Sequence, residues 1–248
     1  MIVINRRILT GFLTIEAILY VSFLTLDILS VIGEYTHDAG MEKLYSTALV
    51  IKYISVSLCL LAAVIRALWA LKDPKASDEC GYRIMIASAL VFTVTADWFI
   101  VFGNENLIGI FSFCAVQTIY IFVIESKKAF TAILVRIIIC ASAVLALHTY
   151  FPDDMLLIGA ALFYGISFIG NVIHQSIKTH RTGTGRLFLA GLILFVLCDI
   201  NVLFYNLGGF VNIGLSYYDV LQSISLVLMW AFYLPSQVLI VLSSRSLR

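Results

Sequence analysis

Two aspartates occupy matching positions in two apolar stretches of the 248-residue chain. Asp97 and Asp199 are each followed seven residues later by an asparagine, Asn104 and Asn206. On a helix, a spacing of seven residues places two side chains on the same face. A protonated carboxyl group beside an ionised one is the usual apparatus for hydrolysing an acetal-like or enol-ether bond. Because an ionised group in lipid is costly, we expect both aspartates to face the protein interior.

Other polar residues also fall inside apolar stretches. Counting about 1.5 Å per residue from the ends of each stretch predicts two layers of them. The outer layer would hold Asp27, Lys52, Asp97, Gln117 and Asp199, and the inner layer would hold Glu16, Arg136, Asn171 and Gln237. In one interpretation Lys52 pairs with one aspartate and the layer only holds helices together. In the other, the excess of carboxylates over lysine leaves at least one aspartate to titrate in a functional range.

The composition indicates that these residues lie in a membrane. Hydrophobic residues make up 61% of the chain and charged residues only 12%. Globular domains carry about 25% charged residues, so the composition excludes a water-soluble enzyme and a disordered protein. A net charge of +1 without a basic cluster excludes a nucleic-acid binder. The expected fold class is an all-α integral membrane protein.

Eight apolar segments are long enough to cross a bilayer as helices. They span residues 8–32, 45–71, 82–102, 108–124, 129–147, 155–177, 187–207 and 218–242. The connections between them are too short for a soluble domain or lid. We therefore expect residues 1–248 to form a single polytopic domain, an eight-transmembrane-helix bundle.

The basic residues predict the orientation, because Lys and Arg are retained on the cytoplasmic side. Twelve of the sixteen lie in connections and ends on one side of this topology, whereas only Lys43 lies on the opposite side. Both termini are therefore expected in the cytoplasm.

An internal similarity relates the third and seventh segments. Residues 89–104 and 191–206, offset by 102 positions, share five identities in sixteen. Either the chain contains two parallel four-helix repeats, 1–124 and 125–248, or apolar sequences match here by chance.

At these positions the sequence resembles the YhhN-like family of eight-helix membrane proteins, which includes the eukaryotic lysoplasmalogenases. The similarity runs roughly from residue 45 to 243. It rests on Lys52, on Ala96-Asp97 where the family commonly has Gly-Asp, and on Tyr120. It continues in Gly191 to Asp199, like the family's Gly-x-x-x-Phe-x-x-Ser-Asp, and in Tyr233 and Gln237, like its Tyr-x-x-x-Gln ending.

The resemblance implies hydrolysis of the vinyl ether bond of a lysoplasmalogen to a fatty aldehyde and a glycerophospho-alcohol. Asp97 and Asp199 would be catalytic, and the substrate would be bound by Lys52, Gln117, Tyr120, Tyr233 and Gln237. The partner would be this membrane lipid, with a homodimer left open. The chain has no HExxH or paired-histidine spacing, so we expect no metal and no cofactor. The family's distribution favours a bacterial cytoplasmic membrane.

The chain departs from the family pattern at three positions. Gln117 stands where the family usually has His, Tyr53 where it has Pro, and Cys198 where it has Ser. Glutamine cannot shuttle a proton. It can replace a histidine that only hydrogen-bonds a head group.

Two other functions use the same features. A transporter or lipid-binding protein would use the buried charges as a coupling site and form no new chemical species. A membrane scaffold or sensor would tolerate substitution of the aspartates.

Overall fold

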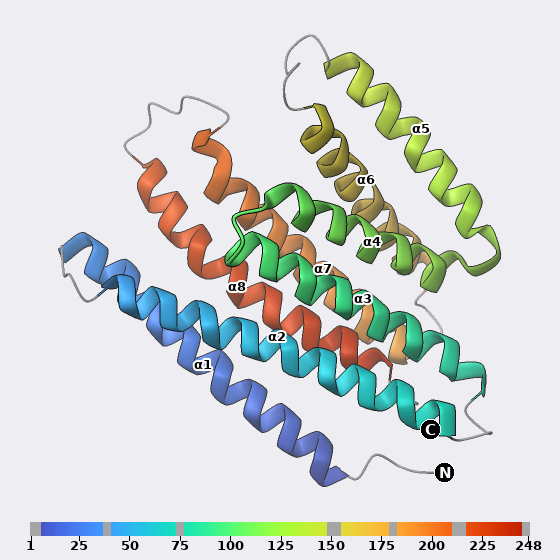
Figure 1. The fold of residues 1–248 in the computed structure, drawn as a ribbon, viewed down its shortest axis with the longest axis horizontal. Helices are drawn as coiled ribbons and strands as arrows, with labels where there is room; N and C mark the ends of the chain where they lie inside the picture. Colours follow the sequence, from blue (N-terminus) through green and yellow to red (C-terminus); the bar gives the residue numbers. More distant parts are fainter. Residues whose placement is uncertain are drawn as a thin grey trace. The chain divides into compact units, whose positions relative to one another are not determined.

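The protein consists of helices and the turns that join them over the residues that its computed structural model describes, which are 6–36, 41–72, 77–147, 155–178, 183–209 and 217–244. The prediction of an all-α protein is confirmed. The helices are α1 Arg6–Thr36, α2 Met41–Lys72, α3 Ser77–Val101, α4 Asn106–Glu125, α5 Ala129–Leu147, α6 Met155–Lys178, α7 Gly183–Asn206 and α8 Tyr218–Ser243, with short 3-10 turns at η2 Ser126–Lys128 and η4 Leu207–Gly209 (Figure 1).

The helices are long and apolar enough for an integral membrane protein. Within the described ranges, seven helical stretches can cross a membrane by length and composition. Helices α4 and α5 count together as one stretch, Asn106–Leu147, because only the three residues of η2 separate them. The number of eight crossings therefore stays a prediction.

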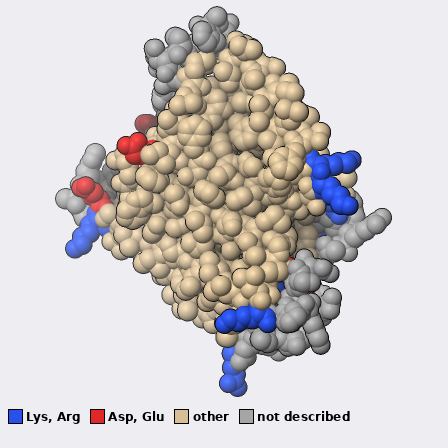
Figure 2. Space-filling view, turned by 45° about the vertical axis from the view of Figure 1, so that its right-hand side comes forward, with Lys and Arg blue, Asp and Glu red and all other residues tan. Residues whose placement is uncertain are grey.

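The molecular surface matches a lipid environment. Large aliphatic side chains point outward on several helices, including Ile18, which is 60% exposed, and Leu145, which is 76% exposed. Figure 2 shows one face on which uncharged residues cover nearly all of the visible surface and charged side chains appear only near the edges. Lipid chains can cover such a surface without desolvating polar groups.

The chain divides into two compact units. Unit 1 comprises Met1–Cys59 and Ala190–Ile240, and unit 2 comprises Leu60–Leu189 and Val241–Arg248. The predicted repeats 1–124 and 125–248 stay a prediction.

In unit 1, contacts between helices distant in sequence hold the packing together. The Tyr20 hydroxyl of α1 donates to the Ala231 carbonyl of α8 at 3.1 Å. The Phe195 ring of α7 contacts the Tyr233 ring of α8, with centroids 5.4 Å apart. Gly191 allows α7 and α8 to approach closely, because a Cβ atom there would lie 3.0 Å from the Ser236 carbonyl oxygen.

In unit 2, α4 packs against both α3 and α6, and α5 packs against α6 (Figure 1). A tight connection joins α3 to α4, in which the Glu105 amide donates to the Phe99 carbonyl at 2.9 Å. Asn104 lies in this connection with φ 53°, a left-handed conformation that asparagine adopts more readily than most residues. The expectation that Asn104 shares a helical face with Asp97 is wrong, because α3 ends at Val101.

The close packing at Gly191 gives a testable prediction. In Gly191→Ala, the new methyl group meets a backbone oxygen that cannot move aside, so overpacking should lower stability by about 1–3 kcal/mol. Gly165→Ala on α6 is the matched control, because nothing lies within 4 Å of a Cβ atom there. Thermal unfolding in detergent measures both variants, and equal stability of the two would contradict the prediction.

Candidate functional site

A fully buried ion pair joins α1 to α2 in unit 1. The Lys52 ammonium nitrogen lies 2.8 Å from Asp27 Oδ1, and both side chains are 0% exposed. This confirms the interpretation that Lys52 pairs with an aspartate, and the partner is Asp27. Each charge compensates the other, which is what allows both to lie inside an apolar bundle.

Three aromatic rings surround the same ammonium group. The Lys52 nitrogen lies 4.8 Å from the ring centroid of Trp230 and 5.7 Å from those of Phe23 and Tyr45. Ring faces attract a cation electrostatically, and the attraction strengthens when water is excluded. These rings were not among the residues predicted from the sequence. Helical spacing could have predicted two of them. Phe23 precedes Asp27 by four residues and Tyr45 precedes Lys52 by seven, so each ring lies on the same helical face as one of the charges.

Glu16 is a second buried acid on α1, and its contacts differ from those of Asp27. It is 3% exposed and accepts hydrogen bonds from the Ser55 hydroxyl and from Cys59 Sγ at 3.6 Å. Eleven residues, about three helical turns, separate Glu16 from Asp27, so α1 presents both acids to α2. Hydrogen-bond donors stabilise Glu16, whereas a cation stabilises Asp27.

Tyr233 and Gln237 lie in the same unit, one helical turn apart on α8. The Tyr233 ring contacts that of Trp230 with centroids 5.4 Å apart, so Trp230 contacts both Tyr233 and Lys52. Gln237 is fully buried and donates from Nε2 to the Ser236 hydroxyl at 3.2 Å. Among the described residues, its Oε1 has no hydrogen-bond partner. Asp199, on α7, also belongs to unit 1 and is partly exposed.

Gln117 lies in unit 2, in a chain of buried polar groups. Arg136 Nη1 donates to Asn171 Oδ1 at 2.9 Å, and Asn171 Nδ2 donates to Gln117 Oε1 at 2.9 Å. The assignment of Gln117 and Asn171 to different layers is therefore wrong. Counting from helix ends assumes upright helices that start at one height, and it ignores the reach of the side chains.

Tyr120 and Asp97 are also buried in unit 2. The Tyr120 ring meets that of Phe188 edge to face, with centroids 5.2 Å apart. Its hydroxyl has no hydrogen-bond partner within the described part of the chain. Asp97, on α3, is only 6% exposed.

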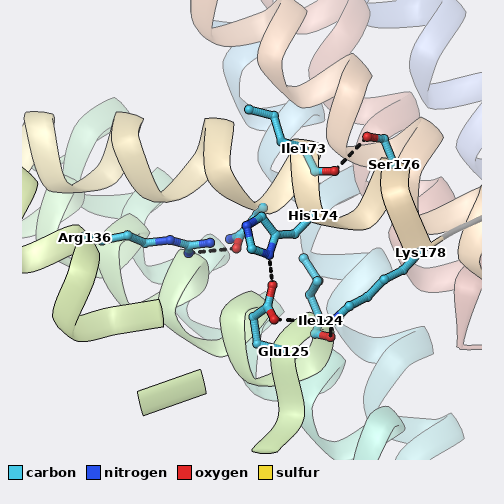
Figure 3. A network of polar contacts seen from close by, with 8 residues as sticks. Ile124, Glu125, Arg136, Ile173, His174, Ser176 and Lys178 are labelled. Atoms are coloured by element: carbon cyan, nitrogen blue, oxygen red, sulfur yellow. Dashed lines mark hydrogen bonds and ion pairs between the residues drawn. The ribbon is translucent and has the colours of Figure 1, made fainter. Parts of the chain in front are cut away.

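Another group of polar residues, Glu125, His174 and Lys178, connects the end of α6 to the end of α4 (Figure 3). Glu125 contacts His174 Nδ1, and its Oε2 lies 3.3 Å from Lys178 Nζ. Lys178 also donates to the Ile124 carbonyl at 2.6 Å, where a cation favourably caps the carboxyl end of α4. His174 and Lys178 are 48% exposed. These satisfied contacts at helix ends indicate a structural role.

No metal centre accompanies these groups in the described ranges. They contain no cluster of three or more His, Cys, Asp or Glu side chains that could hold a metal ion.

The buried pair predicts a large energetic effect of losing one charge. Asp27→Leu leaves an uncompensated ammonium and should cost about 3–5 kcal/mol, whereas Asp27→Leu with Lys52→Met should recover most of the loss. The partly exposed i,i+4 pair formed by Glu79 and Arg83 on α3 is the control, because its disruption by Glu79→Gln should cost under about 1 kcal/mol. Unfolding in detergent measures these differences. A double variant as unstable as Asp27→Leu alone would contradict the interpretation.

Comparison with known proteins identifies the family. Residues 47–244 match the YhhN family, a range that includes every predicted catalytic and binding residue from Lys52 to Gln237 and leaves out Asp27. No curated protein and no solved structure gives a significant match. The match covers most of the chain, and its range agrees with the resemblance carried by the motifs around Lys52, Asp97, Asp199 and Gln237. The chain belongs to the YhhN family.

Proposed function

We propose that this protein is a lysoplasmalogenase-like hydrolase that acts within the membrane. Membership of the YhhN family is the observation that carries the proposal. In the reaction, the vinyl ether oxygen of a lysoplasmalogen leaves as the hydroxyl of a glycerophospho-alcohol. One water molecule is consumed, and the alkenyl chain leaves as a fatty aldehyde.

Asp97 and Asp199 are the proposed catalytic pair. One carboxyl group donates its proton to the vinyl carbon next to the carbon that bears the ether oxygen, which leaves an oxocarbenium ion. The other carboxylate stabilises this cation and then orients the water that attacks it. The resulting hemiacetal breaks down to aldehyde and alcohol. The presence of both aspartates at the positions that resemble the family motifs supports this assignment.

The proposed role of Lys52 is to bind the substrate's phosphate. An ammonium group has three N–H donors, so Lys52 can pair with Asp27 and still donate to a phosphate oxygen. The surrounding rings of Phe23, Tyr45 and Trp230 limit its motion, and this pre-organisation favours binding.

Unpaired polar atoms support the other binding residues. Gln117 Nε2, the Tyr120 hydroxyl and Gln237 Oε1 are buried and lack hydrogen-bond partners among the described residues. Such groups are rare in folded proteins because each costs free energy. Polar groups of a bound substrate would satisfy them.

We further propose eight membrane crossings, with both termini in the cytoplasm of a bacterial cell. As one straight helix, Asn106–Leu147 with its 42 residues would be about 63 Å long, twice the hydrocarbon thickness of a bilayer. Ser126, with φ 49°, interrupts it between α4 and α5, and each of these helices has close to the 20 residues that one crossing needs.

Asp97→Asn and Asp199→Asn should each reduce fatty aldehyde release at least about a thousandfold while leaving a folded protein, because an amide can neither donate nor accept the catalytic proton. Mass spectrometry of the products formed from a lysoplasmalogen measures the release. Asp219→Asn, at an exposed aspartate in the first turn of α8, is the matched control and should retain activity.

Two results would contradict this proposal. Retained activity in either catalytic variant would exclude the aspartate pair. No aldehyde from folded wild-type protein would exclude the hydrolase and favour lipid binding or transport, which liposome flux assays detect.

The topology is tested by the parity of crossings. Eight crossings place both termini on one side of the membrane, whereas seven place them on opposite sides. Reporters active only in the cytoplasm, fused in turn to residues 1 and 248, should therefore both be active. Activity at one end alone would contradict eight crossings.

A further inference from the structure

Three helices of unit 2 contribute to one directed chain of hydrogen bonds. It starts at Arg136 on α5, passes through Asn171 on α6 and ends at Gln117 on α4. Asn171 Nδ2 also donates to the Gln117 backbone oxygen at 3.1 Å. Arg136 is 5% exposed, and Asn171 and Gln117 are fully buried.

The chemistry of the first donor sets the direction of the whole chain. A guanidinium group can only donate, so the Asn171 atom that faces Arg136 must be its oxygen. The Asn171 amide nitrogen then faces Gln117, where a backbone oxygen confirms that a donor is needed. The Gln117 atom that faces Asn171 must in turn be its oxygen. Gln117 Nε2 is thereby turned away from Asn171.

The hydrogen-bond network ends at a donor group that has no acceptor among the described residues. Gln117 Nε2 is buried and has no hydrogen-bond partner in the described part of the protein. The Tyr120 hydroxyl, three residues further along α4, and the Ser167 hydroxyl, four residues before Asn171 on α6, are unpaired as well. A donor held in one orientation and left unpaired fits an oxygen acceptor of a ligand.

The backbone is adapted to hold the guanidinium group. Gly170, the residue before Asn171, lies directly against Arg136, since a Cβ atom there would come within 3.0 Å of Nη2. Figure 3 shows the Arg136 side chain in an extended conformation, with a hydrogen bond at its guanidinium group. The start of the chain is therefore fixed by packing as well as by hydrogen bonding.

We propose that Arg136 and Asn171 are positioning residues that hold Gln117 as a hydrogen-bond donor to an oxygen atom of the lysophospholipid substrate. This inference rests on the proposed function. An amide carries no titratable proton, so Gln117 acts in binding and orientation and takes no part in proton transfer.

Asn171→Asp tests the direction of the chain. The new carboxylate accepts from Arg136 as an ion pair, so the fold is kept, but it cannot donate to Gln117. The Gln117 amide then turns its nitrogen toward this carboxylate and withdraws it from the substrate. Affinity for a 1-O-alkyl lysophospholipid, which lacks the vinyl ether bond, should fall about tenfold, the loss expected for one hydrogen bond. KM for a lysoplasmalogen should rise similarly, with kcat nearly unchanged.

A double-mutant cycle separates positioning from a merely structural role. Gln117→Leu should weaken binding of the analogue about tenfold. In this variant Asn171 can still donate to the backbone oxygen of residue 117. Adding Asn171→Asp to Gln117→Leu should weaken binding no further, because the donor is already absent. Ser176→Asp, which introduces a carboxyl group at an exposed position of α6, is the control and should keep wild-type affinity.

The outcomes separate this inference from the proposed function. Affinity of Asn171→Asp or of Gln117→Leu within about twofold of wild type would overturn the inference, as would additive losses in the double variant. Because the analogue reports binding without turnover, its loss in these variants supports the inference even if the wild type releases no aldehyde. Absence of aldehyde release by the wild type would overturn only the proposed hydrolase activity.

Discussion

A lysine ammonium group without access to water dominates the organisation of unit 1. Lipid offers no hydrogen bonds to such a charge, so the protein must supply both a counter-ion and polarisable surroundings. Asp27 on α1 provides the first, and the rings of Phe23, Tyr45 and Trp230 provide the second. These groups come from α1, α2 and α8, so neutralising one charge also determines which helices must be neighbours.

The other buried charges are stabilised differently. Glu16 is matched by a hydroxyl and a thiol, and Arg136 by the amide oxygen of Asn171. Glu125, at a helix end, has a histidine and a lysine. The contacts of Glu125 are satisfied and partly open to solvent, whereas the buried chain from Arg136 ends in an unpaired donor on Gln117, among the residues that the structure describes. The unpaired donor on Gln117 therefore distinguishes this buried network from the satisfied contacts around Glu125.

The sequence predicted the helices well because an apolar run ends where a helix leaves the membrane. The segment predicted at 129–147 matches α5, and that at 155–177 ends one residue short of α6. One of the two interpretations of the polar residues also had Lys52 pair with an aspartate, because a buried charge in lipid needs a partner. The sequence could not select Asp27 among several carboxylates, because helix rotation decides which side chains meet. Counting residues from the helix ends also placed Gln117 and Asn171 at different depths. Such counting takes no account of helix tilt or of the length of the side chains.

The position of Asp27 along the chain has a consequence for biosynthesis. The family match begins at residue 47, after α1, yet the counter-ion of Lys52 lies on that first helix. A lysine at the centre of a helix entering the membrane costs about 2.5–3.5 kcal/mol on insertion scales. An aspartate costs about as much, so neither α1 nor α2 enters lipid cheaply on its own, and the pair removes the penalty for both. We therefore expect the two helices to insert together as a hairpin, with the first helix compensating a charge that lies within the family-matched region.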